Sequence, residues 1–189
     1  MLSFHDPAMA VSTTLYGTQI LLGPQAALAG ASFSSSVLLR NTAAQSVGFS
    51  AHLIYDQNGA PLTTQLPAAP LAPFEVRRID LSAMQKSGFI PQDVTNAAIQ
   101  IDYAANPGDV MARIFSISSD RSLGLYTALE SFAAKGATGV YWTADESWNT
   151  ILTVTNFASH SDTMSLQLTY PGGPSPCRLC RLGHSSPRG

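Results

Sequence analysis

Two clusters near the C-terminal end of the sequence contain residue types that could bind a metal or a ligand. Cys177 and Cys180 stand in a Cys-x-x-Cys spacing, and His184 follows. Thiolates and imidazoles are common ligands of structural zinc, but a tetrahedral site needs four ligands and no second pair is present. A redox Cys-x-x-Cys normally lies between a strand and a helix, which the surrounding proline- and arginine-rich sequence does not offer. We therefore expect no metal and no cofactor here.

The second cluster is aromatic. Tyr141, Trp142, Asp145 and Trp148 lie within eight residues of one another. Exposed tryptophan and tyrosine next to polar groups can stack on sugar rings or anchor a partner protein. Trp148 aligns with Phe33 in the repeat described below, which favours a core position for it, so Trp142 is the better ligand candidate.

Signatures of catalysis are missing from the chain. The sequence has no Gly-x-Ser-x-Gly, no phosphate-binding Gly-x-x-x-x-Gly-Lys and no His-Glu-x-x-His. His52 is expected on the outer face of a strand, and its repeat counterpart is Gln167, which could not replace a catalytic base. Asp145 and Glu146 are adjacent, and adjacent side chains on an extended chain point apart. We expect a protein without enzymatic activity.

Composition narrows the class of protein further. The 189 residues include 10 Lys plus Arg and 12 Asp plus Glu, giving a net charge of −2. Nucleic-acid binding is disfavoured because there is no basic excess, and no run reaches the roughly 20 apolar residues of a membrane span. Hydrophobic residues are 45% and charged residues only 12%, a mixture common in secreted bacterial proteins. We expect an extracellular, periplasmic or cell-surface protein, with any leader upstream, since Met1–Gly17 contains no Lys or Arg.

An internal repeat relates two segments of the chain. Residues 32–58 align with residues 147–173 without a gap, at an offset of 115, and seven positions are identical, among them Asn41 with Asn156. Both segments alternate apolar and polar residues with a period of two, which indicates half-buried strands. A polar turn separates the two strands of each copy, so each copy is predicted to open with a β-hairpin.

The remaining strands follow from the same alternation. We predict strands at 74–81, 97–104, 110–117, 123–129 and 138–143, a helical turn at 82–88, and turns at 58–59 and 106–109. Met111, Arg113 and Phe115 should share one face of their strand. Eight or nine short strands predict an all-β protein, an antiparallel, Ig-like β-sandwich with little helix, with an open barrel as the alternative.

The repeat also suggests a domain organisation. Residues 1–29 would be the closing strand of a preceding module or a linker, and residues 30–135 a complete sandwich module. Residues 136–173 would be the opening hairpin of a second, truncated module, and 174–189 a disordered, foreign-looking tail. The predicted hairpin 148–170 has an apolar inner face, so we expect it to pack on the sandwich or on another chain, because a lone hairpin is marginal in water.

Several short motifs resemble the sensory rhodopsin transducer family of small bacterial β-sandwich proteins, over residues 36–126. The motifs are Val37-Leu38-Leu39-Arg40-Asn41-Thr42, Ile54-Tyr55-Asp56-Gln57-Asn58-Gly59-Ala60-Pro61, Leu66-Pro67-Ala68, Arg78-Ile79-Asp80-Leu81, Ile90-Pro91 and Ser119-Asp120-Arg121-Ser122. The sequence departs from the family pattern at Ser119, because an arginine is expected before the aspartate that stands at position 120.

The resemblance implies a soluble, non-enzymatic module that associates with partners. We therefore expect a structural or protein-interaction module from a larger repetitive protein, with possible self-association through sheet edges. The alternative is a carbohydrate-binding module that uses the aromatic cluster around Trp142.

Overall fold

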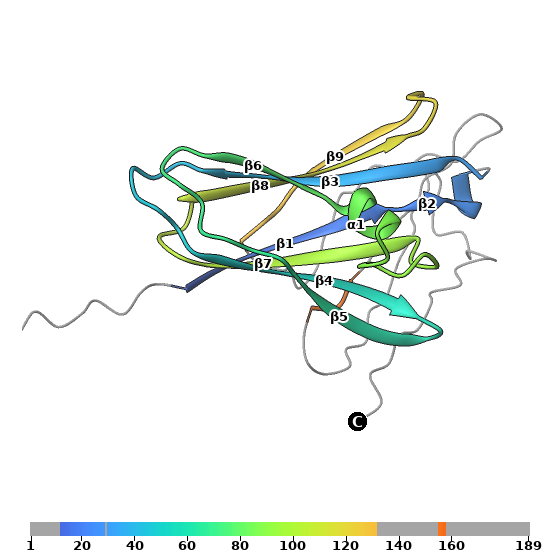
Figure 1. Ribbon diagram of the computed structural model, residues 1–189, viewed down its shortest axis with the longest axis horizontal. Helices are drawn as coiled ribbons and strands as arrows, with labels where there is room; N and C mark the ends of the chain where they lie inside the picture. Colours follow the sequence, from blue (N-terminus) through green and yellow to red (C-terminus); the bar gives the residue numbers. More distant parts are fainter. Residues whose placement is uncertain (1–11, 29, 132–154, 158–189) are drawn as a thin grey trace, which may run out of the picture.

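The computed structural model describes residues 12–28, 30–131 and 155–157, and these residues form a β-sandwich with one short α-helix (Figure 1). The elements in chain order are β1 Ser12–Leu21, β2 Gly23–Pro24, the 3-10 helix η1 Ala26–Leu28, β3 Ser32–Asn41, β4 Phe49–Gln57, β5 Ala60–Leu66, β6 Val76–Asp80, α1 Leu81–Lys86, β7 Asn96–Ala104, β8 Val110–Ser118 and β9 Gly124–Ala128.

Two antiparallel sheets make up the two layers. Sheet A has the strand order β1-β7-β4-β5. In sheet B, β3 is central: β8 and then β9 lie on one side of it, and the short strands β2 and β6 pair with different parts of its other side. The all-β sandwich predicted from the alternation is confirmed, and the open barrel is wrong because the strands form two separate sheets.

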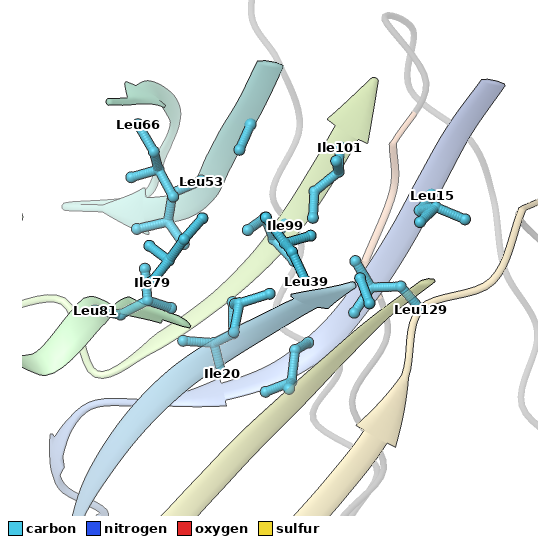
Figure 2. Packing of buried hydrophobic residues seen from close by; sticks show 14 of the residues in the cluster. Leu15, Ile20, Leu39, Leu53, Leu66, Ile79, Leu81, Ile99, Ile101 and Leu129 are labelled. Atoms are coloured by element: carbon cyan, nitrogen blue, oxygen red, sulfur yellow. The ribbon is translucent and has the colours of Figure 1, made fainter. Parts of the chain in front are cut away.

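The hydrophobic core lies between the sheets. Inward residues of the two layers meet there, and Figure 2 shows Leu53 and Ile99 from sheet A facing the same interior as Leu39 and Ile79 from sheet B. The largest of the fully buried side chains are Ile20, Leu22, Val37, Leu39, Leu53, Leu66, Leu71, Leu81, Ile90, Ile99, Ile101 and Ile114. Apolar burial of this extent is the main source of stability in such a domain.

The prediction that residues 32–58 form a hairpin is wrong, although both of its strands exist as β3 and β4. β3 belongs to sheet B and β4 to sheet A, so the segment between them crosses from one layer to the other. Asn41, which is fully buried, fixes this crossing: its side-chain amide donates to the carbonyls of Gln45 (2.7 Å) and Ala72 (2.9 Å), and its oxygen accepts from the Ala43 N–H (2.9 Å). Such buried amide networks stabilise irregular backbone.

β1, which falls in the segment predicted to close a preceding module or to act as a linker, is an edge strand of sheet A. The strand pairs with β7 from Ser12 to Leu21, with a bulge between Gly17 and Ile20. Beyond the bulge, the Leu21 N–H and carbonyl bond to the buried Ser35 hydroxyl of sheet B (3.1 and 2.6 Å). β1 therefore joins the two layers. The other predicted domain boundaries, at residues 135 and 173, lie outside the described residues.

The other strand predictions are confirmed within a few residues, apart from 138–143, which lies outside the described residues. β6, β7, β8 and β9 match the predicted strands. The predicted helical turn is α1, whose N-cap Asp80 accepts from the Ala83 N–H at 3.0 Å. β5, which follows the predicted Asn58-Gly59 turn, was not predicted as a strand.

Candidate partner-binding face

The site residues predicted from sequence lie outside the residues that the structure describes. Tyr141, Trp142, Asp145 and Trp148 fall in the segment 132–154, and Cys177, Cys180 and His184 in the segment 158–189. In the ranges that are described, no group of three or more His, Cys, Asp or Glu side chains could hold a metal ion. The same part of the chain contains no helix with the length and apolar character needed to cross a membrane.

His52 lies on the outer face of sheet A, as predicted. It stands opposite Gln100 of β7 and Gln65 of β5, while its chain neighbours Ala51 and Leu53 point into the core.

The outer face of sheet B gathers three arginines among apolar side chains. The strand registers place Leu38 of β3 between Arg78 of β6 and Arg113 of β8. Two residues further along β3, Arg40 stands between Val76 and Met111. We call this surface the arginine face and define it by Leu38, Arg40, Val76, Arg78, Met111, Arg113, Phe115 and Tyr126.

Strand geometry sets the spacing of the Cα atoms of the three arginines. Adjacent strands lie about 4.8 Å apart, so the Cα atoms of Arg78 and Arg113 are about 10 Å apart across β3. Arg40 is two residues from Leu38, which is about 7 Å along the strand. The three Cα atoms thus form a triangle on the outer face of sheet B.

An aromatic pair closes one end of the arginine face. Phe115 of β8 stands opposite Tyr126 of β9, and their rings meet edge to face at a centroid distance of 5.1 Å and an angle of 90°. Phe115 is half-buried, whereas Tyr126 is 66% exposed. Edge-to-face contacts of this kind are favourable, so the face presents an exposed aromatic ring, packed against Phe115, next to the arginines.

The arginines of this face are largely uncompensated. Arg78 approaches Asp80 at 3.5 Å, but both side chains are exposed, and exposed ion pairs contribute little. Within the described ranges, no hydrogen bond or ion pair reaches the guanidinium groups of Arg40 and Arg113. Three of the six basic residues in 12–131 therefore lie on one face, although that segment carries eight acidic residues.

Arg77, the neighbour of Arg78, has a different role. Its guanidinium bonds to Glu75 and donates to the Pro70 carbonyl (2.9 Å), which fastens the segment between β5 and β6. The pKa of Glu75 is lowered, first by the Ala72 N–H that its carboxylate accepts and then by Arg77. Arg77 is thus a structural residue, in contrast to the arginines of the outer face.

A shallow depression borders the arginine face along β6. It has a volume of about 410 Å³ and is lined on one side by residues 77–80 of β6. Its other walls come from Pro67 after β5 and from Ala83, Met84 and Ser87 at α1. The depression therefore separates the edge of sheet B from the helix.

One part of the arginine face was predicted from the sequence. Met111, Arg113 and Phe115 were predicted to share a face, and their exposure against the buried Ala112 and Ile114 confirms it. Arg40 and Arg78 could not be added from sequence, because their position depends on strand pairs that join residues about 40 and 75 apart.

Comparisons with known proteins give no family assignment. No family model matches the chain, and no curated protein matches it. Among solved structures, the chain is similar to the "Crystal Structure of Thermotoga maritima 1070", with a TM-score of 0.43 and 11% identity. The match covers 64% of this chain and 97% of that one. The β-sandwich implied by the resemblance to the transducer family is present, and the comparisons add nothing about partners.

Proposed function

We propose that this chain is a non-catalytic β-sandwich module that binds a partner protein through the arginine face. The observation that carries the proposal is the alternation of Arg40, Arg78 and Arg113 with exposed apolar side chains on one sheet surface. The low-charge composition and the repeat at an offset of 115 residues support a place in a larger exported protein.

Interface physics favours a protein partner for this surface. Arginine, tyrosine and methionine are enriched in protein–protein interfaces, where an arginine contributes both an apolar stem and a directional charge. Binding of a polyanion would need a continuous basic patch on a basic domain. Here Leu38 separates two of the arginines, and the net charge is −2. The complementary partner surface carries carboxylates spaced among apolar groups.

The test begins with cross-linking and affinity capture of the full chain, followed by purification of the captured partner. The variant Arg40→Glu/Arg113→Glu is expected to weaken partner binding by more than tenfold, because each substitution reverses a charge at the centre of the face. The matched control Thr63→Glu/Gln65→Glu places the same two carboxylates on exposed positions of sheet A and is expected to bind like the parent.

Circular dichroism melting of both variants verifies that each is folded. Equal binding by parent and Arg40→Glu/Arg113→Glu would contradict the proposal. Glycan-array binding that is lost on Trp142→Ala, with no dependence on the arginines, would replace it with the carbohydrate-binding alternative.

A further inference from the structure

The free edge of β6 exposes main-chain hydrogen-bonding groups. The Asn41 N–H donates to the Glu75 carbonyl at 2.9 Å, which makes these two residues a hydrogen-bonded pair of the antiparallel ladder. Hydrogen-bonded pairs recur at every second residue. Arg77 and Ile79 therefore bond to β3, whereas the N–H and C=O groups of Val76 and Arg78 point away from it.

A second hydrogen bond agrees with this assignment of the hydrogen-bonded pairs between β3 and β6. On β3, the Ser35 N–H points toward the β6 side, where it donates to the Ser82 hydroxyl at 2.8 Å. The backbone N–H and C=O groups of Val37 and Leu39, two and four residues further along β3, therefore also point toward β6. Those of Leu38 and Arg40 bond to β8 on the other side.

No strand in the described part of the chain pairs with the outer edge of β6. Val76 is 55% exposed, and the depression of about 410 Å³ runs along the same edge. An edge with alternating free donors and acceptors is satisfied most completely by another extended backbone, because only a backbone repeats N–H and C=O groups at the same spacing.

We propose that an extended segment of the partner adds to sheet B along β6, with apolar residues alternating with acidic ones. Its apolar side chains on one face enter the depression against Met84 and Pro67. Its acidic side chains on the other face lie next to Arg78, in line with the outer surface of the sheet. The inference rests on the proposed function and adds the way in which the partner is held.

Arg78 is the charge beside the edge that favours acidic side chains in the segment. An added strand places an outward side chain about 5 Å from Arg78, whose only ion-pair partner in the described residues is the exposed Asp80 at 3.5 Å. A polyanion would neutralise Arg78 equally well, but it has no N–H donors for the outward carbonyls of β6.

Strand addition along β6 can be tested at Val76 with little damage to the fold. Its N–H points outward, and proline is accepted at the first position of an edge strand. Val76→Pro therefore removes a donor from the free edge and leaves the ladder with β3 intact. Val76→Thr retains the N–H and the β-branched shape, and serves as the matched control.

The probe is an acetylated, amidated octapeptide of alternating Glu and Val, observed by amide chemical shifts and hydrogen exchange of the full chain. We expect slowed exchange at Val76 and Arg78, binding weakened about tenfold by Val76→Pro, and binding unchanged by Val76→Thr. The Lys–Val peptide is expected to bind at least tenfold more weakly. N-methylation of either the glutamates or the valines of the peptide, but not of both sets, should abolish binding, because only one set of N–H groups faces β6. This tests the inference independently of any variant.

The proposal is overturned if the Glu–Val peptide does not bind, if Val76→Pro binds it like the parent, or if inorganic polyphosphate binds equally to the parent and to Val76→Pro and displaces the peptide. Partner binding that is lost in Arg40→Glu/Arg113→Glu but unaffected by Val76→Pro would overturn strand addition alone and leave the proposed function standing.

Discussion

On the outer face of sheet A, polar side chains bond to one another, whereas on the outer face of sheet B two of the three arginines do not. Asp102 of β7 accepts a hydrogen bond from Thr14 of β1 at 2.6 Å and further bonds from Gln100. Across the molecule, Arg40 and Arg113 have no such partner in the described residues. Both faces are built by the same period-two alternation, so the fold does not dictate this difference.

Sheet A is also covered in part by a distant segment of the chain. The ring of Phe157 lies 4.7 Å from the ring of Tyr16 of β1, at an angle of 55°. Phe157 belongs to the turn of the predicted second hairpin; the strands of that hairpin, 148–154 and 164–170, lie outside the described residues, so its packing stays a prediction. The face of sheet A is thus partly occupied by the chain itself, and the face of sheet B is the better candidate for a partner.

The largest effect should come from the hydrogen-bonded carboxylate of sheet A. Asp102→Ala removes the acceptor of Thr14 and Gln100, and we expect it to lower the free energy of unfolding by about 1–3 kcal/mol. Arg113→Ala on sheet B should change it by no more than about 0.5 kcal/mol, as is usual for an unpartnered surface residue. Urea denaturation measures both, and equal losses would show that the two faces do not differ as described.

Two aromatic pairs give a finer test. A double-mutant cycle on Tyr16 and Phe157 should yield a coupling of about 0.5–1.5 kcal/mol, and so should a cycle on Phe115 and Tyr126. The second pair joins neighbouring strands, so it serves as the reference for a pair within one sheet. Zero coupling between Tyr16 and Phe157, with normal coupling in the reference pair, would mean that the C-terminal segment does not stabilise sheet A.

The smallest effect is expected in the loop between β8 and β9, at the edge of sheet B. The Ser118 hydroxyl, at 2.6 Å, and then the Ser122 N–H and hydroxyl lower the pKa of Asp120 from 3.8 to about 2. Since the folded pKa lies below the unfolded one, this contribution to stability is present above about pH 4 and is lost as the pH falls toward 2.

Asp120→Asn is therefore expected to melt below the parent at pH 5, with the difference in Tm shrinking at pH 2. Scanning calorimetry at both values measures it. A difference in Tm that stays constant between pH 5 and pH 2 would show that the carboxylate charge is not what these hydrogen bonds stabilise.

Strand positions and their buried faces could be predicted from sequence because the alternation is local. The pattern of Phe49, Ala51, Leu53 and Tyr55 identified β4 and its inner face, and the same logic placed Met111, Arg113 and Phe115 together. β5 was not predicted as a strand because its residues are almost all exposed and Pro61 lowers its strand propensity. Proline is tolerated there because β5 is an edge strand.

Only the tertiary structure decided which strands are neighbours. Sequence proximity suggested that β3 and β4 form a hairpin, but β3 pairs with β8 and β6, and β4 with β7 and β5. The same long-range pairing brought Arg40, Arg78 and Arg113 onto one face. The sequence by itself determined which residues turn inward, because burial follows the local period of the strand; it did not determine the candidate site, because a register between distant strands is set by the packing of the whole sandwich.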